Sequence, residues 1–335
     1  MGSMDQEMTA FPGWIARDSA GATLDRLDPA MLDDLDTTVR VRCSSINYKD
    51  ALALHGRPGV VRRHPLVVGI DLTGEVLMSR HPRWQAGDVV TLNGAGLGED
   101  LHGGLAGLAA VNGDDLVRVP AQLGPLRAAA IGTAGFTAAL SLLALERHGL
   151  APETGPILVT GAGGGVGSIA VALLAAARYE VIAATGRPAE LSSQLTALGA
   201  AQVLDRAELA ASGKPLGKQR WAGVLDAVGG SVLAGALAGL QHSGVATTCG
   251  LAGGAEYPGN VLPFILRGVS LLGIDSVRTP PLRREAAWQR LAQLLDPALL
   301  DSVTRVVPLS DAKDAAASLL AGAGTGRIVV DVASA

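Results

Sequence analysis

Aromatic side chains and cysteines are scarce in this sequence. Only 3% of its 335 residues are Phe, Trp or Tyr, whereas 48% are hydrophobic and the mean hydropathy is +0.33. The cores must therefore be aliphatic. The two cysteines, Cys43 and Cys249, exclude a disulfide framework and a structural four-cysteine zinc lobe. The length is sufficient for two domains.

The chain also lacks an excess of positive charge, and its first residues do not lead us to expect a signal sequence. Its 27 basic and 31 acidic residues give a net charge of −4, which provides no reason to expect a nucleic acid or a membrane as partner. No basic and then apolar segment opens the sequence, and we expect no apolar run of the roughly 18 residues that a membrane-spanning helix needs. We therefore expect a soluble, cytoplasmic protein.

Residues 156–187 predict one continuous strand–turn–helix–strand unit. A short apolar run, 157–160, enters a glycine-rich bend at 161–167. Apolar residues at helical spacing follow over 169–177, and a second apolar run occupies 181–184. In a βαβ unit of this kind the N-terminus of the helix holds the diphosphate of a dinucleotide. The segment therefore predicts a dinucleotide cofactor.

The glycine spacing departs from the strict G-x-G-x-x-G pattern. Glycines suit this turn because side chains would keep its backbone N–H groups away from the diphosphate oxygens, and Gly167 lets the helix lie close on the strand. A glycine string is often only a flexible loop, but this one stands between a strand and a helix. With alanine at the first place, the register that fits is Ala162, Gly163, Gly164, Gly165, Val166 and Gly167, and we assign Gly163, Gly164, Gly165 and Val166 to the cofactor.

No carboxylate follows the second strand, where an NAD site usually has Asp or Glu to bind the ribose 2′-hydroxyl. The chain has Thr185, Gly186 and Arg187 there. A carboxylate would repel a 2′-phosphate, whereas a guanidinium pairs with it and a hydroxyl donates to it. These residues predict NADPH, with Arg206 after the next strand as a further candidate. The alternative is that Arg187 is an ordinary surface arginine.

The predicted fold class is α/β, with a Rossmann doubly wound parallel sheet and a β-rich domain that is split in sequence. Short strand-like runs punctuated by Gly, Pro and Asp fill residues 1–125, alternating helices and strands fill 126–277, and 278–335 again resembles the first part. The predicted strands are 38–42, 67–70, 74–77, 88–92, 116–119, 157–160, 181–184, 202–204, 223–227, 244–249, 269–275, 304–307 and 327–332, and the helices are 127–147, 166–177, 189–198, 231–240 and 283–295.

A set of segments, in order along the chain, carries a family resemblance. They are SSINYKDALAL (44–54), RRHPLVVGIDLTGEV (62–76), GTAGFTAAL (132–140), VTGAGGGVGS (159–168), TGRP (185–188), WAGVLDAVGG (221–230), CGLAGG (249–254), PFILRGVSLLGIDSV (263–277) and TPPLRR (279–284). Together they resemble the medium-chain dehydrogenases/reductases, in the quinone-oxidoreductase-like branch that contains NADPH-dependent acryloyl-CoA reductases. The resemblance implies a GroES-like catalytic domain, split around the Rossmann domain, with the active site in the cleft between them.

The resemblance also bears on zinc. Zinc alcohol dehydrogenases have a Cys where this sequence has Asn47 and a His where it has Ile70. Catalytic zinc needs three protein ligands and an open position, so the chain resembles the zinc-free branch and we expect no metal. Cys43 stands four residues early and is expected to be a small core residue.

Without a metal Lewis acid, the reaction expected is reduction of an activated C=C bond. Hydride from NADPH reaches the β-carbon of an enone or enoyl thioester, charge builds on the carbonyl oxygen, and the α-carbon takes a proton. The leading hypothesis is an NADPH-dependent ene-reductase acting on a 2-enoyl-CoA such as acryloyl-CoA. The alternatives are a quinone or enone oxidoreductase and an NADPH-binding protein with little turnover.

Tyr48 is the first candidate for a catalytic residue and for a contact of the nicotinamide. Its phenol either donates to the enolate or relays a proton, or it merely packs against the ring. Asn47, at the place of the lost zinc ligand, is the second catalytic candidate, but it would equally cap a helix that begins at Tyr48. Lys49 and Asp50 are candidates for a local ion pair.

Further cofactor contacts are expected on the helix and strands of the Rossmann domain. Thr133 and Thr137 either meet the cofactor or cap and pack the helix, and for Thr133 the second interpretation is favoured. Leu251 ends a strand on the edge where dinucleotides lie, and Ile265 has a similar place but would also suit the core. We assign Thr137, Leu251 and Ile265 to the cofactor.

One departure from the family concerns the acceptor pocket. Members that resemble this chain usually carry tryptophans where Ala95 and His102 stand. Losing both predicts a wider pocket and a bulkier enoyl or enone acceptor. His102 adds a titratable group, either a proton donor or a plain surface residue. The other expected partner is a second copy of the chain, because relatives join their sheets edge to edge and 269–274 would be the edge strand.

Overall fold

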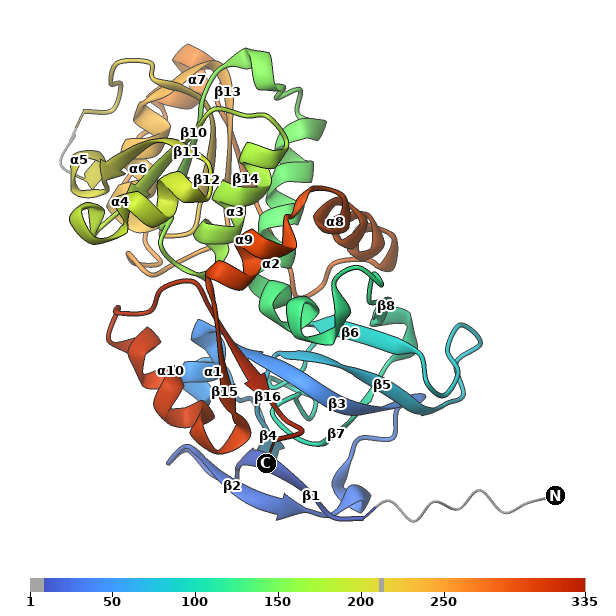
Figure 1. The fold of residues 1–335 in the computed structure, drawn as a ribbon. Helices are drawn as coiled ribbons and strands as arrows, with labels where there is room; N and C mark the ends of the chain where they lie inside the picture. Colours follow the sequence, from blue (N-terminus) through green and yellow to red (C-terminus); the bar gives the residue numbers. More distant parts are fainter. Residues whose placement is uncertain (1–8, 211–213, 335) are drawn as a thin grey trace. The chain divides into compact units, whose positions relative to one another are not determined.

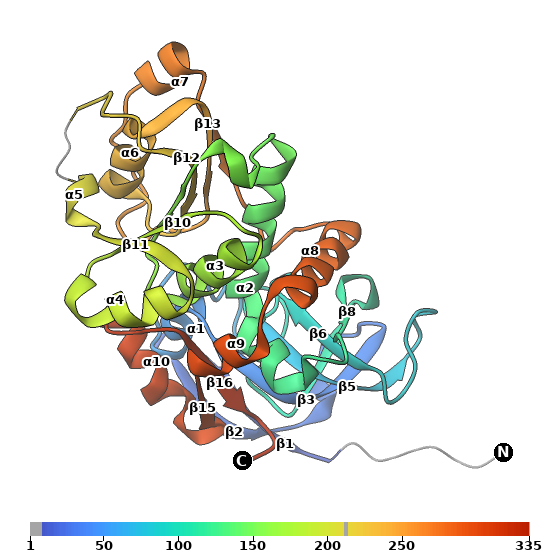
Figure 2. The same ribbon diagram turned by 45° about the horizontal axis from the view of Figure 1, so that its top comes forward.

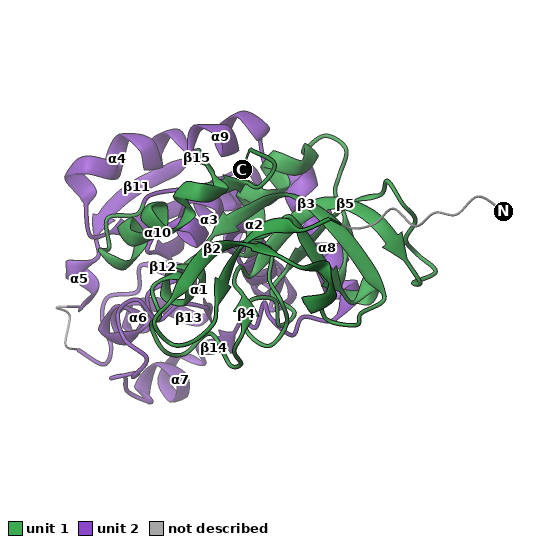
Figure 3. Cartoon of the chain, turned by 90° about the horizontal axis from the view of Figure 1, so that it is seen from below, with its two compact units in different colours: residues 1–133, 305–324, 328–335 green, residues 134–304, 325–327 purple. Residues whose placement is uncertain are grey.

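The computed structural model describes residues 9–210 and 214–334, and the chain divides into two compact units. Unit 1 consists of residues 1–133, 305–324 and 328–335, and unit 2 of residues 134–304 and 325–327 (Figure 3). Unit 1 is thus discontinuous in sequence. The domain boundaries at 125 and 278 stay a prediction; the compact units differ from them by including helices α8 (Pro281–Leu294) and α9 (Pro297–Ser302) in unit 2.

Unit 1 is built mainly of antiparallel strands. A seven-stranded sheet has the order β15-β16-β3-β5-β6-β8, with β7 paired to β3, and a three-stranded sheet has the order β2-β1-β4. Its elements are β1 (Phe11–Ala16), β2 (Ala22–Leu27), β3 (Thr37–Ile46), α1 (Tyr48–Leu54), β4 (Leu66–Val67), β5 (Asp71–Ser79), β6 (Val89–Asn93), β7 (Leu108–Val111), β8 (Val117–Arg118), β15 (Thr304–Pro308), α10 (Ala312–Leu320) and β16 (Arg327–Asp331), with 3₁₀ turns η1 (Pro29–Met31), η2 (Gly113–Asp115) and η4 (Leu309–Asp311).

The core of unit 1 is largely aliphatic, as the composition predicts. Along β3 the buried Val39 and Val41 alternate with Arg40 and Arg42, because successive side chains of a strand point to opposite faces. Trp14 of β1 is one of the few aromatic members of this core. Its indole N–H donates to the carbonyl oxygen of Leu309 at 2.8 Å, which joins the first strand to the C-terminal segment of the same unit.

Unit 2 is a doubly wound parallel sheet. Its strand order is β11-β10-β9-β12-β13-β14, and the neighbouring strands pair in parallel. The chain reverses its direction of winding between β9 and β12, and dinucleotides bind beyond the carboxyl ends of strands at such a switch point. The elements are η3 (Pro152–Thr154), β9 (Ile157–Thr160), α3 (Gly165–Ala176), β10 (Val181–Thr185), α4 (Pro188–Ala197), β11 (Ala200–Asp205), α5 (Ala207–Ala210), β12 (Trp221–Asp226), α6 (Gly230–Ala238), β13 (Leu240–Thr248), α7 (Leu262–Arg267), β14 (Ser270–Gly273), α8 and α9.

Helices cover the sheet of unit 2, and the alternation along each strand decides which side chains meet which helix. Leu158, Ile182 and Val224 pack with residues of α6 in one buried cluster. Val159 and Ala183 are equally buried but point to the other face, because neighbouring side chains alternate. Helix α3 contacts the same strands, β9 and β10. Figures 1 and 2 show these helices beside the strands of unit 2.

The expectation of no long apolar segment is wrong. Helix α2 (Gly124–Arg147) is long and apolar enough to cross a membrane, with a mean hydropathy of 1.8 over its most apolar 18 residues. However, 78% of that stretch is buried inside the protein, which is the environment of a core helix. The helix is also interrupted near its first third, because Gly132 has a φ of 47° that an α-helix does not accommodate.

The sequence pattern predicts unit 2 better than unit 1. Strand β9 spans the predicted residues, and the other predicted strands and helices of unit 2 differ by a few residues at their ends, although the short helices α5, α7 and α9 are missed. In unit 1 the pattern misses β1, β2, β7 and α10. Strand β1 contains Pro12 and Gly13, which are signals of turns, and β2 has four exposed residues in a row, so neither shows the alternation typical of a strand.

Candidate functional site

The glycine-rich turn of unit 2 forms the start of helix α3. Strand β9 ends at Thr160, Gly161 takes a φ of 64°, and α3 begins at Gly165 with Gly164 as its N-cap. Residues 163–166 are half-exposed, whereas the helix is buried from Gly167 to Leu174. The first N–H groups of a helix have no partner within it. The exposed start of α3 therefore fits an anionic ligand, as the sequence predicts.

Two of the turn glycines make room for different parts of unit 2. A side chain at Gly167 would collide with the backbone of Gly161 and approach the Cα of Ala162 to 2.6 Å, so this glycine lets the helix lie on the strand as predicted. A side chain at Gly163 would instead collide with Leu191 of α4. Gly163 therefore leaves room for the end of the Leu191 side chain, which is a reason that the spacing of glycines does not reveal.

Arg327 is a residue of this turn that the sequence analysis misses. It is buried, and its Nη1 atom lies 2.8 Å from the place that a side chain on Gly165 would take. The neighbouring Gly326 donates its N–H to the carbonyl oxygen of Gly163 at 3.2 Å. A guanidinium beside the N-terminus of α3 adds positive charge where the helix already favours an anion. The only sequence signal is an arginine that opens the apolar run of β16.

The residues predicted to bind a 2′-phosphate lie together at the ends of β10 and β11. Thr185 is buried, its Oγ1 accepts the N–H of Arg187 at 3.3 Å, and its carbonyl oxygen accepts the N–H of Arg206 at 2.9 Å. The Nε of Arg206 lies 2.8 Å from the place that a side chain on Gly186 would take. The guanidinium of Arg187 pairs with Glu190 at 3.4 Å. Two arginines therefore flank one turn.

A buried carboxylate, Asp226, fixes the carboxyl ends of the central strands of unit 2. It accepts the hydroxyls of Thr160 at 2.6 Å and Thr248 at 2.9 Å, and the N–H of Gly229 at 3.0 Å. These partners belong to β9, to the turn after β12 and to β13. The sequence analysis does not single out Asp226, although its place at the end of a predicted strand is a usable signal.

The remaining predicted cofactor residues of unit 2 have different surroundings. Thr137 of α2 is 5% exposed, whereas Leu251 and Ile265 are 61% and 68% exposed. Large exposed apolar side chains are typical of binding or contact surfaces when they cluster. The alternative that Ile265 belongs to the core is therefore wrong. Their assignment to the cofactor stays a prediction.

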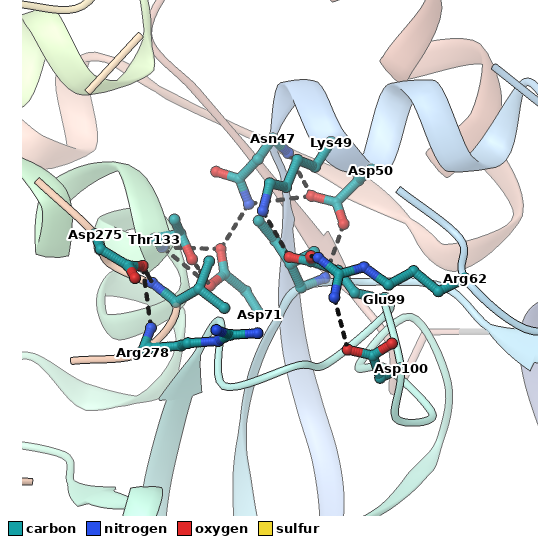
Figure 4. Close-up of polar contacts among 12 residues, drawn as sticks. Asn47, Lys49, Asp50, Arg62, Asp71, Glu99, Asp100, Thr133, Asp275 and Arg278 are labelled. Atoms are coloured by element: carbon teal, nitrogen blue, oxygen red, sulfur yellow. Dashed lines mark hydrogen bonds and ion pairs between the residues drawn. The ribbon is translucent and has the colours of Figure 1, made fainter. Parts of the chain in front are cut away.

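In unit 1 Asn47 connects β3 to α1, and Tyr48 and Lys49 are the first two residues of α1; we call these three residues the 47–49 turn. Helix α1 begins at Tyr48 with Asn47 as N-cap, so the capping interpretation is confirmed. The backbone N–H of Asn47 donates to Asp50 at 2.7 Å, and its Nδ2 donates to Asp50 at 3.1 Å and to Asp71 at 2.7 Å (Figure 4).

The expected ion pair between Lys49 and Asp50 is wrong. Lys49 instead pairs with the buried Glu99 at 2.6 Å, and Arg62 approaches the same carboxylate at 3.4 Å. Asp50 is fully buried and accepts the N–H of Ile70 at 2.8 Å in addition to Asn47. Burial, followed by the nearby charge of Asp71, raises the pKa of Asp50 to about 7. Asp50 and Lys49 are therefore neighbours in sequence with different surroundings, because the side chain of Asp50 is buried and that of Lys49 reaches the surface.

Asp71, at the start of β5, is the most heavily hydrogen-bonded side chain of this region, and the sequence analysis gives it no role. It accepts bonds from Ser45, Asn47, Asn93 and Thr133. Thr133 donates both its N–H and its hydroxyl to this carboxylate, so its side chain is engaged within the protein. A sequence signal exists, because an aspartate directly follows a predicted apolar strand.

The interpretation of His102 as a plain surface residue is wrong, and its interpretation as a proton donor stays a prediction. The residue is 3% exposed, and its Nδ1 accepts the backbone N–H of Val67 at 3.0 Å. Burial lowers the pKa of its imidazole, despite the opposing charge of Asp33. Ala95 takes a φ of 53°, which is unusual for a residue with a side chain. The predicted widening of the acceptor pocket stays a prediction.

Two protein families match the chain. The alcohol dehydrogenase GroES-like domain family matches residues 33–121, and the zinc-binding dehydrogenase family matches residues 165–296. The sheets of the two units and the glycine turn define the class, and the chain belongs to the medium-chain dehydrogenases/reductases. Although the second family is described as zinc-binding, the described residues contain no group of three His, Cys, Asp or Glu side chains that could hold a metal ion.

Within this family the chain is similar along most of its length to acrylyl-CoA reductases, which confirms the resemblance. It is 48% identical over 311 residues to the probable acrylyl-CoA reductase AcuI of Escherichia coli (strain K12), covering 93% of this chain and 95% of the relative. Identity to the acrylyl-CoA reductase AcuI of Ruegeria pomeroyi is 46% over 319 residues, covering 94% and 96%. The crystal structure of E. coli K-12 YhdH with bound NADPH has a TM-score of 0.92 at 46% identity, covering 97% of this chain and 100% of that one.

Replacing Arg187 by Asp should weaken NADPH binding about 100-fold while changing NADH binding less than about threefold, because a charge-assisted pair with the 2′-phosphate becomes a repulsion. Isothermal titration of both cofactors measures the two dissociation constants. Arg305→Asp, at an exposed arginine of β15, changes the net charge equally and serves as control. Equal losses for NADPH and NADH in the Arg187 variant would contradict the 2′-phosphate assignment.

Proposed function

We propose that the protein reduces the activated C=C bond of a 2-enoyl-CoA thioester such as acryloyl-CoA, with NADPH as reductant. The proposal rests chiefly on identities of 48% and 46% to two acrylyl-CoA reductases, which extend over 93% and 94% of this chain. When bound, the nicotinamide supplies a hydride. The chain's own residues have to hold the cofactor, stabilise the charge on the carbonyl oxygen and supply a proton to the α-carbon.

Most residues of the cofactor site that we propose lie in unit 2, and Tyr48 belongs to unit 1. The half-exposed start of α3 and the guanidinium of Arg327 suit a diphosphate, because both present positive charge to an anion. The flanking arginines suit a 2′-phosphate. The proposed contacts are Gly163, Gly164, Gly165, Val166 and Arg327 for the diphosphate, Thr185, Gly186, Arg187 and Arg206 for the 2′-phosphate, and Tyr48, Thr137, Leu251 and Ile265 for the nicotinamide half.

Tyr48 is the proposed catalytic residue of unit 1. Its side chain is 48% exposed, so its phenol is open to a ligand, and a phenol donates a hydrogen bond to a developing oxyanion or relays a proton. Asn47 is the second candidate. However, its Nδ2 already donates to two carboxylates, which supports a part in orienting Tyr48 more than direct contact with the substrate.

We also propose that the protein is a cytoplasmic homodimer. Among the described strands β14 pairs only with β13, so its outer edge presents unpaired N–H and C=O groups to a second copy. Val261 and Leu266, in the segment before β14, are 65% and 58% exposed and would be covered in such a dimer. Light scattering should give twice the monomer mass of 33.9 kDa; the monomer mass at micromolar concentration would exclude it.

The acceptor is tested by offering acryloyl-CoA, crotonyl-CoA and a simple quinone in parallel and following NADPH absorbance. We expect rapid oxidation with the enoyl thioesters and at least about tenfold lower kcat/KM with the quinone, because the proposed oxyanion donor is positioned for the carbonyl oxygen of a bound enoyl thioester. If only the quinone is reduced, the protein is instead a quinone oxidoreductase. If no acceptor is reduced despite tight NADPH binding, it is a binding protein.

Replacing Tyr48 by Phe removes the phenol hydroxyl and little else. We expect kcat for acryloyl-CoA to fall about 100-fold, with the KM for NADPH within about threefold, because the loss falls on the step that needs a donor at the oxyanion. Steady-state kinetics with each substrate varied in turn measure the two effects separately. An unchanged kcat would reduce Tyr48 to a packing residue.

A further inference from the structure

We propose that Asp71 is a positioning residue, which orients the 47–49 turn and thereby Tyr48. Asp71 itself is 1% exposed and is therefore not a group that meets the substrate. The relevance of this arrangement to catalysis rests on the proposed function of Tyr48. The arrangement itself does not, because it follows from hydrogen bonds within unit 1.

The carboxylate of Asp71 collects donors from several elements. Five donor groups surround its two oxygens, and a carboxylate only accepts, so it matches all of them. They come from β3, the 47–49 turn, β6 and the residue after the kink of α2. The bonds are Ser45 Oγ at 2.6 Å, Asn47 Nδ2 at 2.7 Å, Asn93 Nδ2 at 2.8 Å, Thr133 N at 2.9 Å and Thr133 Oγ1 at 2.7 Å.

The orientation of Asn47 follows from two carboxylates at once. Its Nδ2 lies against carboxylate oxygens of both Asp71 and Asp50. Because these oxygens accept hydrogen bonds, the side-chain amide must turn its N–H₂ group, and not its oxygen, toward them. Asp50 also accepts the backbone N–H of Asn47, and it accepts the N–H of Ile70 with its other oxygen. The start of the 47–49 turn is therefore held at its backbone and at its side chain.

The end of the 47–49 turn is held by a different buried carboxylate. Lys49 pairs with Glu99, whose side chain is 5% exposed, at 2.6 Å (Figure 4). Between the two held residues lies Tyr48, whose side chain is half-exposed. The two neighbours thus carry the contacts that fix the backbone, and the phenol is left for a ligand. The pair with Glu99 has a cation at the surface, so Asp71 is expected to contribute more.

Asp71→Asn is the sharpest change, because it keeps the shape of the side chain and exchanges one acceptor oxygen for an N–H₂ group. The new donor then faces a set of donors, so at least one of them loses its acceptor. Asp88→Asn is the matched control, since Asp88 is a carboxylate of the same unit that accepts bonds from Arg118 and from the N–H of Gln85.

Orientation can be read without turnover by ¹⁹F NMR of protein labelled with 3-fluorotyrosine. The chain has three tyrosines, so three resonances are expected, and Tyr48→Phe assigns the one of interest. In Asp71→Asn we expect the Tyr48 resonance to shift or split, while those of Tyr179 and Tyr257, both in unit 2, stay in place. In Asp88→Asn all three should remain. An unmoved Tyr48 resonance in folded Asp71→Asn overturns the proposal.

Kinetics then separate positioning from a purely structural role. We expect Asp71→Asn to lower kcat about tenfold with little change in the KM for NADPH, and we expect no further loss when it is added to Tyr48→Phe. Full additivity of the two losses would mean that Asp71 does not act through Tyr48. If Tyr48→Phe leaves kcat unchanged but Asp71→Asn moves the resonance, the function of Tyr48 fails and the positioning stands.

If Asp71→Asn does not fold, single donors can be removed instead. Ser45→Ala and Thr133→Val each delete one hydroxyl that donates to Asp71 and leave the carboxylate in place. Either variant should move the Tyr48 resonance in the same direction by a smaller amount. If neither variant moves it, the positioning proposal is overturned.

Discussion

A buried carboxylate persists in a protein only where donors surround it, because removing the charge from water is costly unless hydrogen bonds replace the lost hydration. Each unit of this protein contains such a carboxylate at the ends of its central strands. Asp71 gathers donors from β3, β6 and α2, and Asp226 gathers donors from β9, β13 and the turn after β12. In both units the loops that follow these strands are consequently anchored by one acidic side chain.

Part of the site can be predicted from the sequence and part cannot, because some of its contacts join residues close together in the chain and others join residues far apart. The cofactor turn is local, since strand, glycines and helix follow one another within some thirty residues, and the absence of an acid after Thr185 is visible directly. The resemblance supplies Asn47 and Tyr48. By contrast, Glu99 pairs with a lysine fifty positions earlier, and Arg327 approaches a glycine far away in the chain. No periodicity or spacing encodes such pairs.

The predictions that fail for Asp50, His102 and helix α2 have one physical cause, which is that the sequence does not show which side chains are buried. The sequence suggests an ion pair with Lys49 for Asp50, and a proton donor or a surface position for His102. Both residues are buried, and each accepts a hydrogen bond from a backbone N–H group that would otherwise lack a partner. Helix α2 is the opposite case, because its apolar side chains would suit a membrane but are mostly buried in the protein interior. Composition therefore gives the amount of core material, but it does not say which polar groups the core retains.

The path of the last strand has a consequence for the architecture. Arg327 belongs to unit 2, where it lies beside the glycine turn, whereas the next residue, Ile328, belongs to unit 1 and pairs with Ile46 of β3. Ile46 directly precedes Asn47. A single peptide bond thus joins Arg327, which lies beside the glycine turn, to Ile328, which pairs with the residue before the 47–49 turn. Ending the chain before residue 325 would remove both together, so the C-terminus is a shared component of the two units.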